Sequence, residues 1–188
     1  MKVIKRLFDV IFSLIFIVLC LPLLIVIAIA IKLDSPGPIL YYRKFDGSPV
    51  YRVGAQGKIF RYFKFRSMEH GNRGKEEEIT RVGKIIRPWH LDELPELFLV
   101  LLGKMSLVGA RHCTMEQYFN YPSELFEGWT VKPGMTGPSQ LKGKFFPIKE
   151  RVASDLAYIK NWSLASDFKL ILVTPFVIFQ KRKDPHFK

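Results

Sequence analysis

Cysteine is scarce in this sequence, and acidic residues are outnumbered by basic ones. The two cysteines are Cys20, which lies in an apolar stretch, and Cys113, which lies in a polar one. A framework of disulfides is therefore not expected, and a reducing compartment is predicted for the main domain. The two cysteines and four histidines are not spaced like the ligands of a structural zinc ion, which argues against a zinc-finger domain.

The shortage of acidic residues leaves the chain strongly basic. Lys and Arg number 29 against 17 Asp and Glu, so the formal net charge is +12 at pH 7. Such a surface attracts nucleic acid, an acidic lipid surface or a phosphorylated small molecule, and charge alone does not choose among them. With 188 residues the chain is long enough for one domain with its own core. We expect a domain at residues 34–188 attached to an N-terminal segment at residues 1–33.

Charged side chains are absent from residues 10–31, which are nearly all Leu, Ile, Val, Phe or Ala. As a helix this stretch would be about 33 Å long, close to the thickness of a bilayer core. A cleaved signal peptide is one interpretation, because basic residues precede the stretch. Its apolar part is longer than the about 7 to 15 residues of such peptides, which favours a membrane helix.

Pro22 divides this apolar stretch near its middle. Proline removes one helical hydrogen bond and clashes with the preceding turn, so a kink is predicted there. Basic residues exceed acidic ones on both flanks, which places both ends on the cytoplasmic side. A re-entrant helix that bends at Pro22 and returns to the same face satisfies both flanks, and a straight spanning helix remains an alternative.

Short extended pieces and turns follow the apolar stretch. Residues 34–57 contain DSPGP, DGSP and GAQG around ILYY and PVYRV, a pattern typical of a short β-hairpin. Residues 58–68, KIFRYFKFRSM, alternate basic and aromatic side chains like a half-buried strand. Lys64 and Arg66 should then point outward, either into solvent or toward a phosphate or lipid headgroup. Residues 70–79 are polar and contain glycine, so a loop is predicted.

Helical patterns dominate the second half of the chain. A helix is expected over residues 97–102, ended by Gly103, and another over residues 149–163. Residues 131–143 hold too much Gly and Pro for regular structure. Residues 170–179 are apolar but too few to span a bilayer, and basic residues follow them. They could join the core or lie at the membrane interface, and we favour the interface. The predicted fold class is α+β, mainly α, with interfacial amphipathic helices.

The stretch WHLDELPELF, residues 89–98, reads as the beginning of a helix, because Pro95 is tolerated only in a first turn. In one interpretation Asp92 caps the helix and Glu93 complements its dipole. In the other, Asp92 stays ionised and attacks phosphorus as a nucleophile. Neighbouring helical residues point about 100° apart, so Glu93 would then have the separate role of binding Mg²⁺.

HLDELPELF, followed by GKMSLVGAR and VKPGMTG, resembles the bacterial sugar transferases, specifically the monotopic polyprenyl-phosphate phosphoglycosyl transferases. The motifs KRLFD, SPGP, RVG, KFRSM, GKIIR and DLAYIKNWS also occur in the order found in that family. The resemblance implies transfer of a sugar 1-phosphate from a nucleotide sugar, such as a UDP sugar, to undecaprenyl or another polyprenyl phosphate, with release of UMP. It also implies a monotopic enzyme on the cytoplasmic face of the bacterial inner membrane, in its minimal form, and favours the re-entrant helix over the straight spanning one.

In this resemblance Asp92 and Glu93 are the catalytic residues, Asp92 forms an aspartyl phosphosugar, and Glu93 binds the Mg²⁺ cofactor. Our candidates for binding phosphate or nucleotide sugar are Lys64, Arg66, Arg87, Arg111, Lys132, Asp155 and Tyr158. Lys132 stands where the family usually has arginine, and Ala110 and His112 stand where it usually has proline, which leaves donor specificity open.

The expected partners are a nucleotide sugar, a polyprenyl phosphate and an anionic phospholipid membrane, but not nucleic acid. Two other functions are compatible with a basic chain: a membrane-tethered nucleic-acid-binding module and a non-enzymatic membrane scaffold. The nucleic-acid-binding alternative leaves the DELPE segment unexplained, and the scaffold gives Asp92 no role beyond that of a helix cap.

Overall fold

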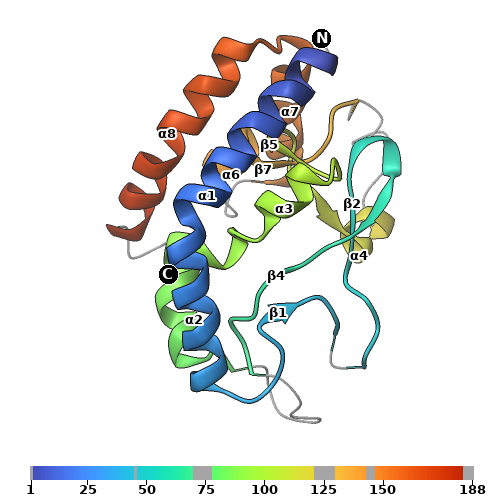
Figure 1. Cartoon of the computed structure of the whole chain (residues 1–188). Coiled ribbons are helices and arrows are strands. Elements are labelled where there is room, and N and C mark those ends of the chain that lie inside the picture. The colour runs from blue at the N-terminus through green and yellow to red at the C-terminus, as the bar shows by residue number, and fades with distance from the viewer. Residues whose placement is uncertain (1, 45, 70–77, 121–129, 143–146, 184–188) are drawn as a thin grey trace.

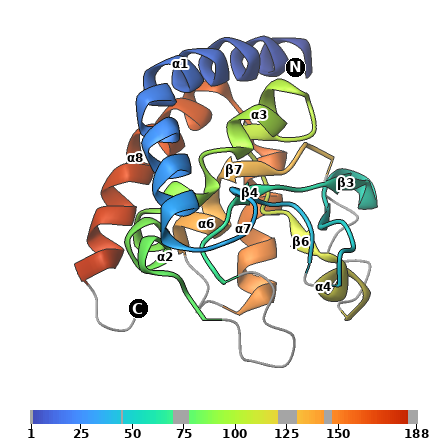
Figure 2. The ribbon, with the colours of Figure 1, turned by 60° about the horizontal axis from the view of Figure 1, so that its bottom comes forward.

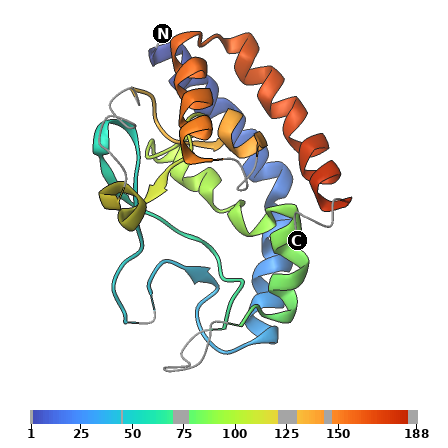
Figure 3. The same ribbon diagram turned by 180° about the vertical axis from the view of Figure 1, so that it is seen from behind.

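The computed structural model describes residues 2–44, 46–69, 78–120, 130–142 and 147–183. Most of the loop expected at residues 70–79 therefore lies outside the described residues. The described part is mainly helical with small sheets, which confirms the α+β class. Figure 1 shows two long helices, α1 and α8, side by side along one edge of the molecule, and Figure 3 shows the same pair from behind.

Helix α1 (Lys2–Asp34) contains the whole charge-free stretch. It is long and apolar enough to cross a membrane from Val3 to Asp34, and only 17% of its most apolar window is buried within the protein. The break expected at Pro22 is not confirmed, because the helix continues through this residue. One missing hydrogen bond does not end a helix whose flanking turns remain intact. The helix does change direction part-way along its length, as Figure 2 shows.

The helices that follow are shorter. They are α2 (Arg81–Ile86), η2 (Arg87–Trp89), η3 (Leu91–Glu93), α3 (Glu96–Leu101), α4 (Met115–Asn120), α6 (Pro138–Lys142), α7 (Ile148–Lys160) and α8 (Leu164–Lys183). The helices expected near residues 97–102 and 149–163 are confirmed as α3 and α7, and Gly103 follows α3 with φ of 74°. This left-handed conformation suits the glycine that ends a helix.

Helix α8 is longer than the apolar stretch within it. Leu170 and Ile171 pack against the main core, whereas Leu172 and Phe176 are 67% and 71% exposed. Core packing and an interfacial position were predicted as alternatives for residues 170–179. The structure shows that one face of α8 packs in the core while another face is exposed. Pro175 lies inside this helix, as Pro22 lies inside α1.

Three small sheets complete the described part of the fold. Their strands are β1 (Leu40–Tyr41), β2 (Tyr51–Val53), β3 (Ile59–Arg61), β4 (Lys64–Phe65), β5 (Ser106–Val108), β6 (Cys113–Thr114) and β7 (Gly134–Thr136). The hairpin expected within residues 34–57 does not form between β1 and β2, because β1 pairs with β4 instead. Strand β2 forms a hairpin with β3, across the turn η1 (Ala55–Gly57), and β6 pairs on the other side of β2. Strand β1 pairs antiparallel with β4, and β5 pairs parallel with β7.

Residues 131–143 were predicted to be irregular, but β7 occupies Gly134–Thr136 and α6 occupies Pro138–Lys142, so this prediction is wrong. Their glycines serve a close approach between strands rather than a flexible loop. A Cβ on Gly134 would lie 2.0 Å from the backbone nitrogen of Gly109, and a Cβ on Gly109 would lie 2.3 Å from the carbonyl oxygen of Lys132. Only glycine allows the two backbones to approach so closely.

Arg66 points inward, contrary to the prediction from the alternating pattern. It is 2% exposed, and its guanidinium donates to the Pro38 carbonyl at 2.7 Å, the Ser35 carbonyl at 2.8 Å and the Ser35 hydroxyl at 2.6 Å. The alternation fails because β4 ends at Phe65, so the next side chain need not reverse direction. Arg66 therefore holds the end of α1 to the domain.

The beginning of α1 is also bonded to the domain. Lys5 Nζ donates to Asp167 at 2.6 Å, and Arg6 donates to the last carbonyls of α3, Val100 at 2.6 Å and Leu101 at 2.7 Å. Asp9 accepts from the Ser106 hydroxyl and the Leu107 amide of β5. The KRLFD motif thus connects α1 to three separate elements. The buried apolar core lies directly beneath these contacts, around Val100, Met105 and Val108.

Candidate active site

Asp92 and Glu93 lie on the short turn η3, immediately before α3. Asp92 is 3% exposed, and its Oδ2 accepts a hydrogen bond from Lys64 Nζ of β4 at 2.6 Å. Neither η3 nor α3 has a side-chain cap, so the interpretation of Asp92 as a helix cap is wrong. Its carboxylate instead faces a lysine on a strand that is distant in sequence.

Burial raises the pKa of Asp92, and the neighbouring Lys64 cation only partly offsets this effect. Once ionised, a more basic carboxylate is a better nucleophile than an ordinary aspartate. The ion pair with Lys64 keeps this buried charge compensated. Asp92 is therefore an aspartate of raised basicity, held in place by one strong contact.

Glu93 differs from Asp92 in both exposure and charge. Burial opposes its ionisation, but the hydrogen bond from His90 and the charges of His90 and Arg111 lower its pKa. His90 Nδ1 lies 3.3 Å from Glu93 Oε2, and the side chain of Glu93 is 29% exposed. His90 has φ of 54°, a left-handed conformation that turns the chain sharply between η2 and η3. Two adjacent carboxylates thus occupy different environments.

A buried cluster supports this turn from behind. The hydroxyl of Tyr62 donates to Glu96 Oε1 at 2.5 Å, and Glu96 is 2% exposed. Burial raises the pKa of Glu96 well above its usual value. The Tyr62 ring also lies 4.7 Å from the Arg52 guanidinium and 5.0 Å from the His112 ring. Burial, together with Arg52 and Arg111, lowers the pKa of His112 to about 3, so this imidazole is neutral.

No catalytic or binding role was predicted from the sequence for His90, Tyr62, Glu96 or His112. For Glu96 a signal was available, because it follows Glu93 by three positions and so lies one helical turn further on the same side. His90 precedes the carboxylate pair directly, but its left-handed backbone gives no sequence signal. Tyr62 and His112 meet only through packing of distant segments.

Arg111 is the second candidate that the fold brings to the carboxylates. Its charge lowers the pKa of Glu93, and its backbone amide donates to Asp155 Oδ2 at 3.0 Å. Asp155 is 1% exposed and also accepts from the Ser139 amide at 3.1 Å and the Ser139 hydroxyl at 2.8 Å. All three contacts of Asp155 are to the protein itself. Asp155 therefore positions the segment that carries Arg111 and does not face the carboxylate pair.

The remaining candidates lie elsewhere. Tyr158 is buried and donates to Asp167 Oδ1 at 2.5 Å, so it helps to join α7 and α8. A Cβ on Gly103 would lie 3.3 Å from Lys132 Nζ, which places Lys132 at the far end of α3 from Asp92. Arg87 lies half-buried on η2, one turn before the pair, and takes part in none of the ion pairs found among the described residues.

The carboxylate pair suits Mg²⁺ by its donor chemistry. Mg²⁺ is usually bound by one or two carboxylates together with water and substrate phosphate oxygens, rather than by a complete protein cage. No group of three or more His, Cys, Asp or Glu side chains suited to a metal occurs in the part of the chain that the structure describes. Glu93, partly exposed and with a lowered pKa, is the carboxylate best suited to such a site.

Fold and site together define a basic α+β domain with a paired, buried carboxylate, attached to a long apolar helix. The chain belongs to the bacterial sugar transferase family, whose sequence profile matches residues 1–181.

Individual relatives are similar over most of this chain. It is 37% identical to a UDP-glucose:undecaprenyl-phosphate glucose-1-phosphate transferase of Klebsiella pneumoniae, in an alignment that covers 93% of this chain and 40% of that protein. It is 35% identical to the exopolysaccharide production protein PSS of Rhizobium leguminosarum bv. phaseoli, over 92% of this chain and 93% of that protein. The chain thus spans less than half the length of the Klebsiella relative and nearly all of the Rhizobium one.

Proposed function

We propose that this protein transfers a sugar 1-phosphate from a nucleotide diphosphate sugar, with UDP as the nucleotide, to undecaprenyl phosphate. UMP would be the second product. The observation that carries the proposal is the buried Asp92, paired with Lys64 at 2.6 Å on a turn influenced by the charge of Arg111. Membership of the bacterial sugar transferase family supports the same reaction, because its Klebsiella relative is named for transfer of glucose 1-phosphate to undecaprenyl phosphate.

The first step is an attack by the Asp92 carboxylate on the phosphorus that carries the sugar. A bond forms between Asp92 and this phosphorus, the phosphoanhydride bond breaks, and UMP leaves with the bond electrons. Lys64, already beside Asp92, compensates negative charge on the phosphoryl oxygens during this step. The product is an aspartyl phosphosugar.

In the second step a phosphate oxygen of undecaprenyl phosphate attacks the same phosphorus. The bond to Asp92 breaks, and the carboxylate returns to its ion pair with Lys64. Arg111 is suited to hold a diphosphate, because guanidinium binds phosphate oxygens in a bidentate manner. No net proton transfer is required in either step.

Glu93 is the residue that would hold Mg²⁺. A bound Mg²⁺ supplies charge neutralisation on the diphosphate, which favours attack by an anionic nucleophile. His90 keeps Glu93 ionised for this role through the 3.3 Å contact.

The location follows from the substrates. The acceptor phosphate lies at headgroup depth, so a domain on the cytoplasmic face of the inner membrane, held by α1 as a re-entrant helix, would bring Asp92 to it. The exposed apolar face of α8 adds a second contact with the membrane interface.

Asp92→Asn provides the decisive test of the mechanism. The purified protein is incubated with UDP sugars, undecaprenyl phosphate and Mg²⁺, and UMP release and lipid-linked product are measured. Because an amide is a very poor nucleophile, the variant should lose both activities by at least about 1,000-fold. Intact-mass measurement of the wild-type protein with donor alone should show an added phosphosugar that Asp92→Asn lacks. UMP release that persists in the variant would contradict a nucleophilic Asp92.

A further inference from the structure

A pocket of about 360 Å³ lies between β1, the segment 61–63 that joins β3 to β4, and α3. Its size is within the range typical of ligand sites, at the small end. The lining consists of apolar and aromatic side chains with three cations: Leu40, Tyr42, Arg43, Pro49, Arg61, Tyr62, Phe63, Leu99, Leu102 and Lys104. Although three of the ten lining residues are cations, most of the exposed wall is apolar.

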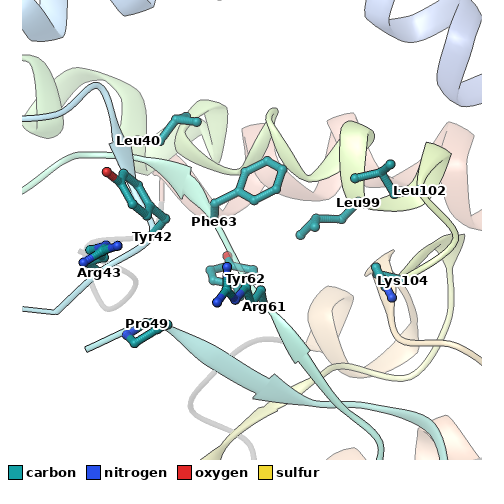
Figure 4. Close-up of a pocket in the computed structure, with 10 residues that line it drawn as sticks. All are labelled: Leu40, Tyr42, Arg43, Pro49, Arg61, Tyr62, Phe63, Leu99, Leu102 and Lys104. Carbon is teal, nitrogen blue, oxygen red and sulfur yellow. The ribbon is translucent and has the colours of Figure 1, made fainter. Parts of the chain in front are cut away.

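The apolar and basic residues occupy different sides of this pocket. Figure 4 shows Leu40, Phe63, Leu99 and Leu102 in a row, with Arg43, Arg61 and Lys104 spread along one side of it, Arg43 and Lys104 at opposite ends. Leu102 is 68% exposed, and α3 packs along the apolar helix α1. An apolar chain could thus enter from the side of the protein that carries its membrane helix.

The three cations are available to an anion. Arg43, Arg61 and Lys104 are all exposed, and none of them belongs to an ion pair among the described residues. An apolar cavity with cations on one side complements a molecule that has an apolar chain and an anionic head. A nucleotide fits less well, because its base and ribose would leave polar atoms against a mostly apolar wall.

The pocket lies apart from the carboxylate of Asp92, where the proposed reaction takes place. Leu99 of α3 follows Asp92 of η3 by seven residues, which corresponds to about 10 Å at the helical rise of about 1.5 Å per residue. The Tyr62 ring lines the pocket, whereas its hydroxyl is bonded to Glu96 on the side of the carboxylates. A phosphate on the cationic side of this pocket is therefore not the phosphate attacked at Asp92.

We propose that this pocket binds an anionic membrane phospholipid, with an acyl chain against Leu40, Phe63 and Leu99 and the phosphate on the side of the pocket that carries the cations. The site is independent of the proposed transferase reaction. It would hold the β1–β4 region against the bilayer in addition to the hold provided by α1.

Photocrosslinking in nanodiscs tests this site. The full chain is reconstituted with phosphatidylglycerol that carries a diazirine at the acyl terminus, irradiated, digested and mapped by mass spectrometry. We expect adducts on peptides containing Leu40, Phe63 or Leu99. The triple variant Arg43→Gln, Arg61→Gln, Lys104→Gln should reduce these adducts at least fivefold. A matched triple at exposed cations elsewhere, Arg81→Gln, Lys84→Gln and Lys160→Gln, should leave them unchanged.

Lipid identity is tested with the same photoreactive chain on phosphatidylcholine, which should label the pocket at least fivefold less. Equal labelling by the two lipids, or equal loss in both triple variants, would overturn the proposal. Competition experiments distinguish the remaining possible occupants. Unlabelled phosphatidylglycerol should suppress the adducts. Preferential suppression by undecaprenyl phosphate would instead show that the pocket binds the acceptor, and suppression by UDP would show that it binds the donor.

Discussion

Lys64 is the residue whose charge most directly controls Asp92. Its ammonium lowers a pKa that burial raises, so Lys64→Met should raise the pKa of Asp92 further. The ionised nucleophile would then be lost at a higher pH as the solution is acidified. We expect the acid limb of the kcat/KM profile to move toward higher pH, with a plateau lowered about 10- to 100-fold, as for the loss of one charged hydrogen bond.

The matched control for this prediction is Lys58→Met, which removes an exposed lysine of the same basic stretch. Its pH profile should coincide with that of the wild type. An acid limb that stays in place in Lys64→Met would mean that Lys64 does not affect ionisation of the nucleophile.

Tyr62 supports the carboxylate turn through a single hydroxyl. Tyr62→Phe would leave Glu96 buried without its donor at 2.5 Å, which costs about 1 to 3 kcal/mol of unfolding free energy. Glu96→Gln keeps an acceptor for the same hydroxyl and should cost less. Chemical denaturation of the two variants measures the difference, and equal destabilisation would show that this hydrogen bond is not the source.

At the residue scale, the sequence could predict the carboxylate pair but not its partners. Pro95 and the order of motifs identified a helix start at Asp92 and Glu93. The ion pair with Lys64 depends on β4 packing against η3, which no local pattern encodes. Arg66 was misplaced for a related reason, because period-2 alternation holds only within a strand, and β4 ends one residue earlier.

At the scale of elements, the pairing of β5 with β7 depends on Gly134. A Cβ there would lie 2.0 Å from the backbone nitrogen of Gly109, and neither backbone can yield without losing the strand pair. Gly134→Ala should therefore lower the unfolding free energy by about 3 kcal/mol or more. Gly47→Ala is the control: its φ is 81° but no atom lies within 4 Å of the added carbon, so strain alone should cost about 1 to 2 kcal/mol. Similar losses in both variants would exclude the steric explanation.

Secondary structure was predicted correctly where apolar residues recur at helical spacing over a long segment. It was predicted wrongly where glycine and proline are frequent. α7 was anticipated by the spacing of its apolar residues, and α3 by Gly103. Residues 131–143 misled because glycine was interpreted as flexibility, whereas in β7 it permits close approach. Such an approach involves a second segment, so the composition of one segment cannot reveal it.

On the scale of the whole molecule, both ends of α1 are bonded to the same domain. Near its beginning, Arg6 donates to the carbonyls of Val100 and Leu101 in α3. At its end, Asp34 accepts from the Val82 amide of α2, and Arg66 donates to the neighbouring Ser35. A straight helix through a bilayer would place these two ends on opposite sides, so the contacts support the proposed re-entrant topology.

Cysteine labelling tests this topology directly. Lys2→Cys and Pro36→Cys, the latter at an exposed position just after α1, are introduced one at a time into a chain with Cys20→Ser and Cys113→Ala. A membrane-impermeant maleimide is then applied to spheroplasts and to inverted inner-membrane vesicles. Because both ends of α1 contact one domain, both cysteines should react in inverted vesicles and resist labelling in spheroplasts. Opposite accessibility of the two positions would require a spanning helix, and the contacts of Arg6 and of Asp34 could then not exist in the same molecule.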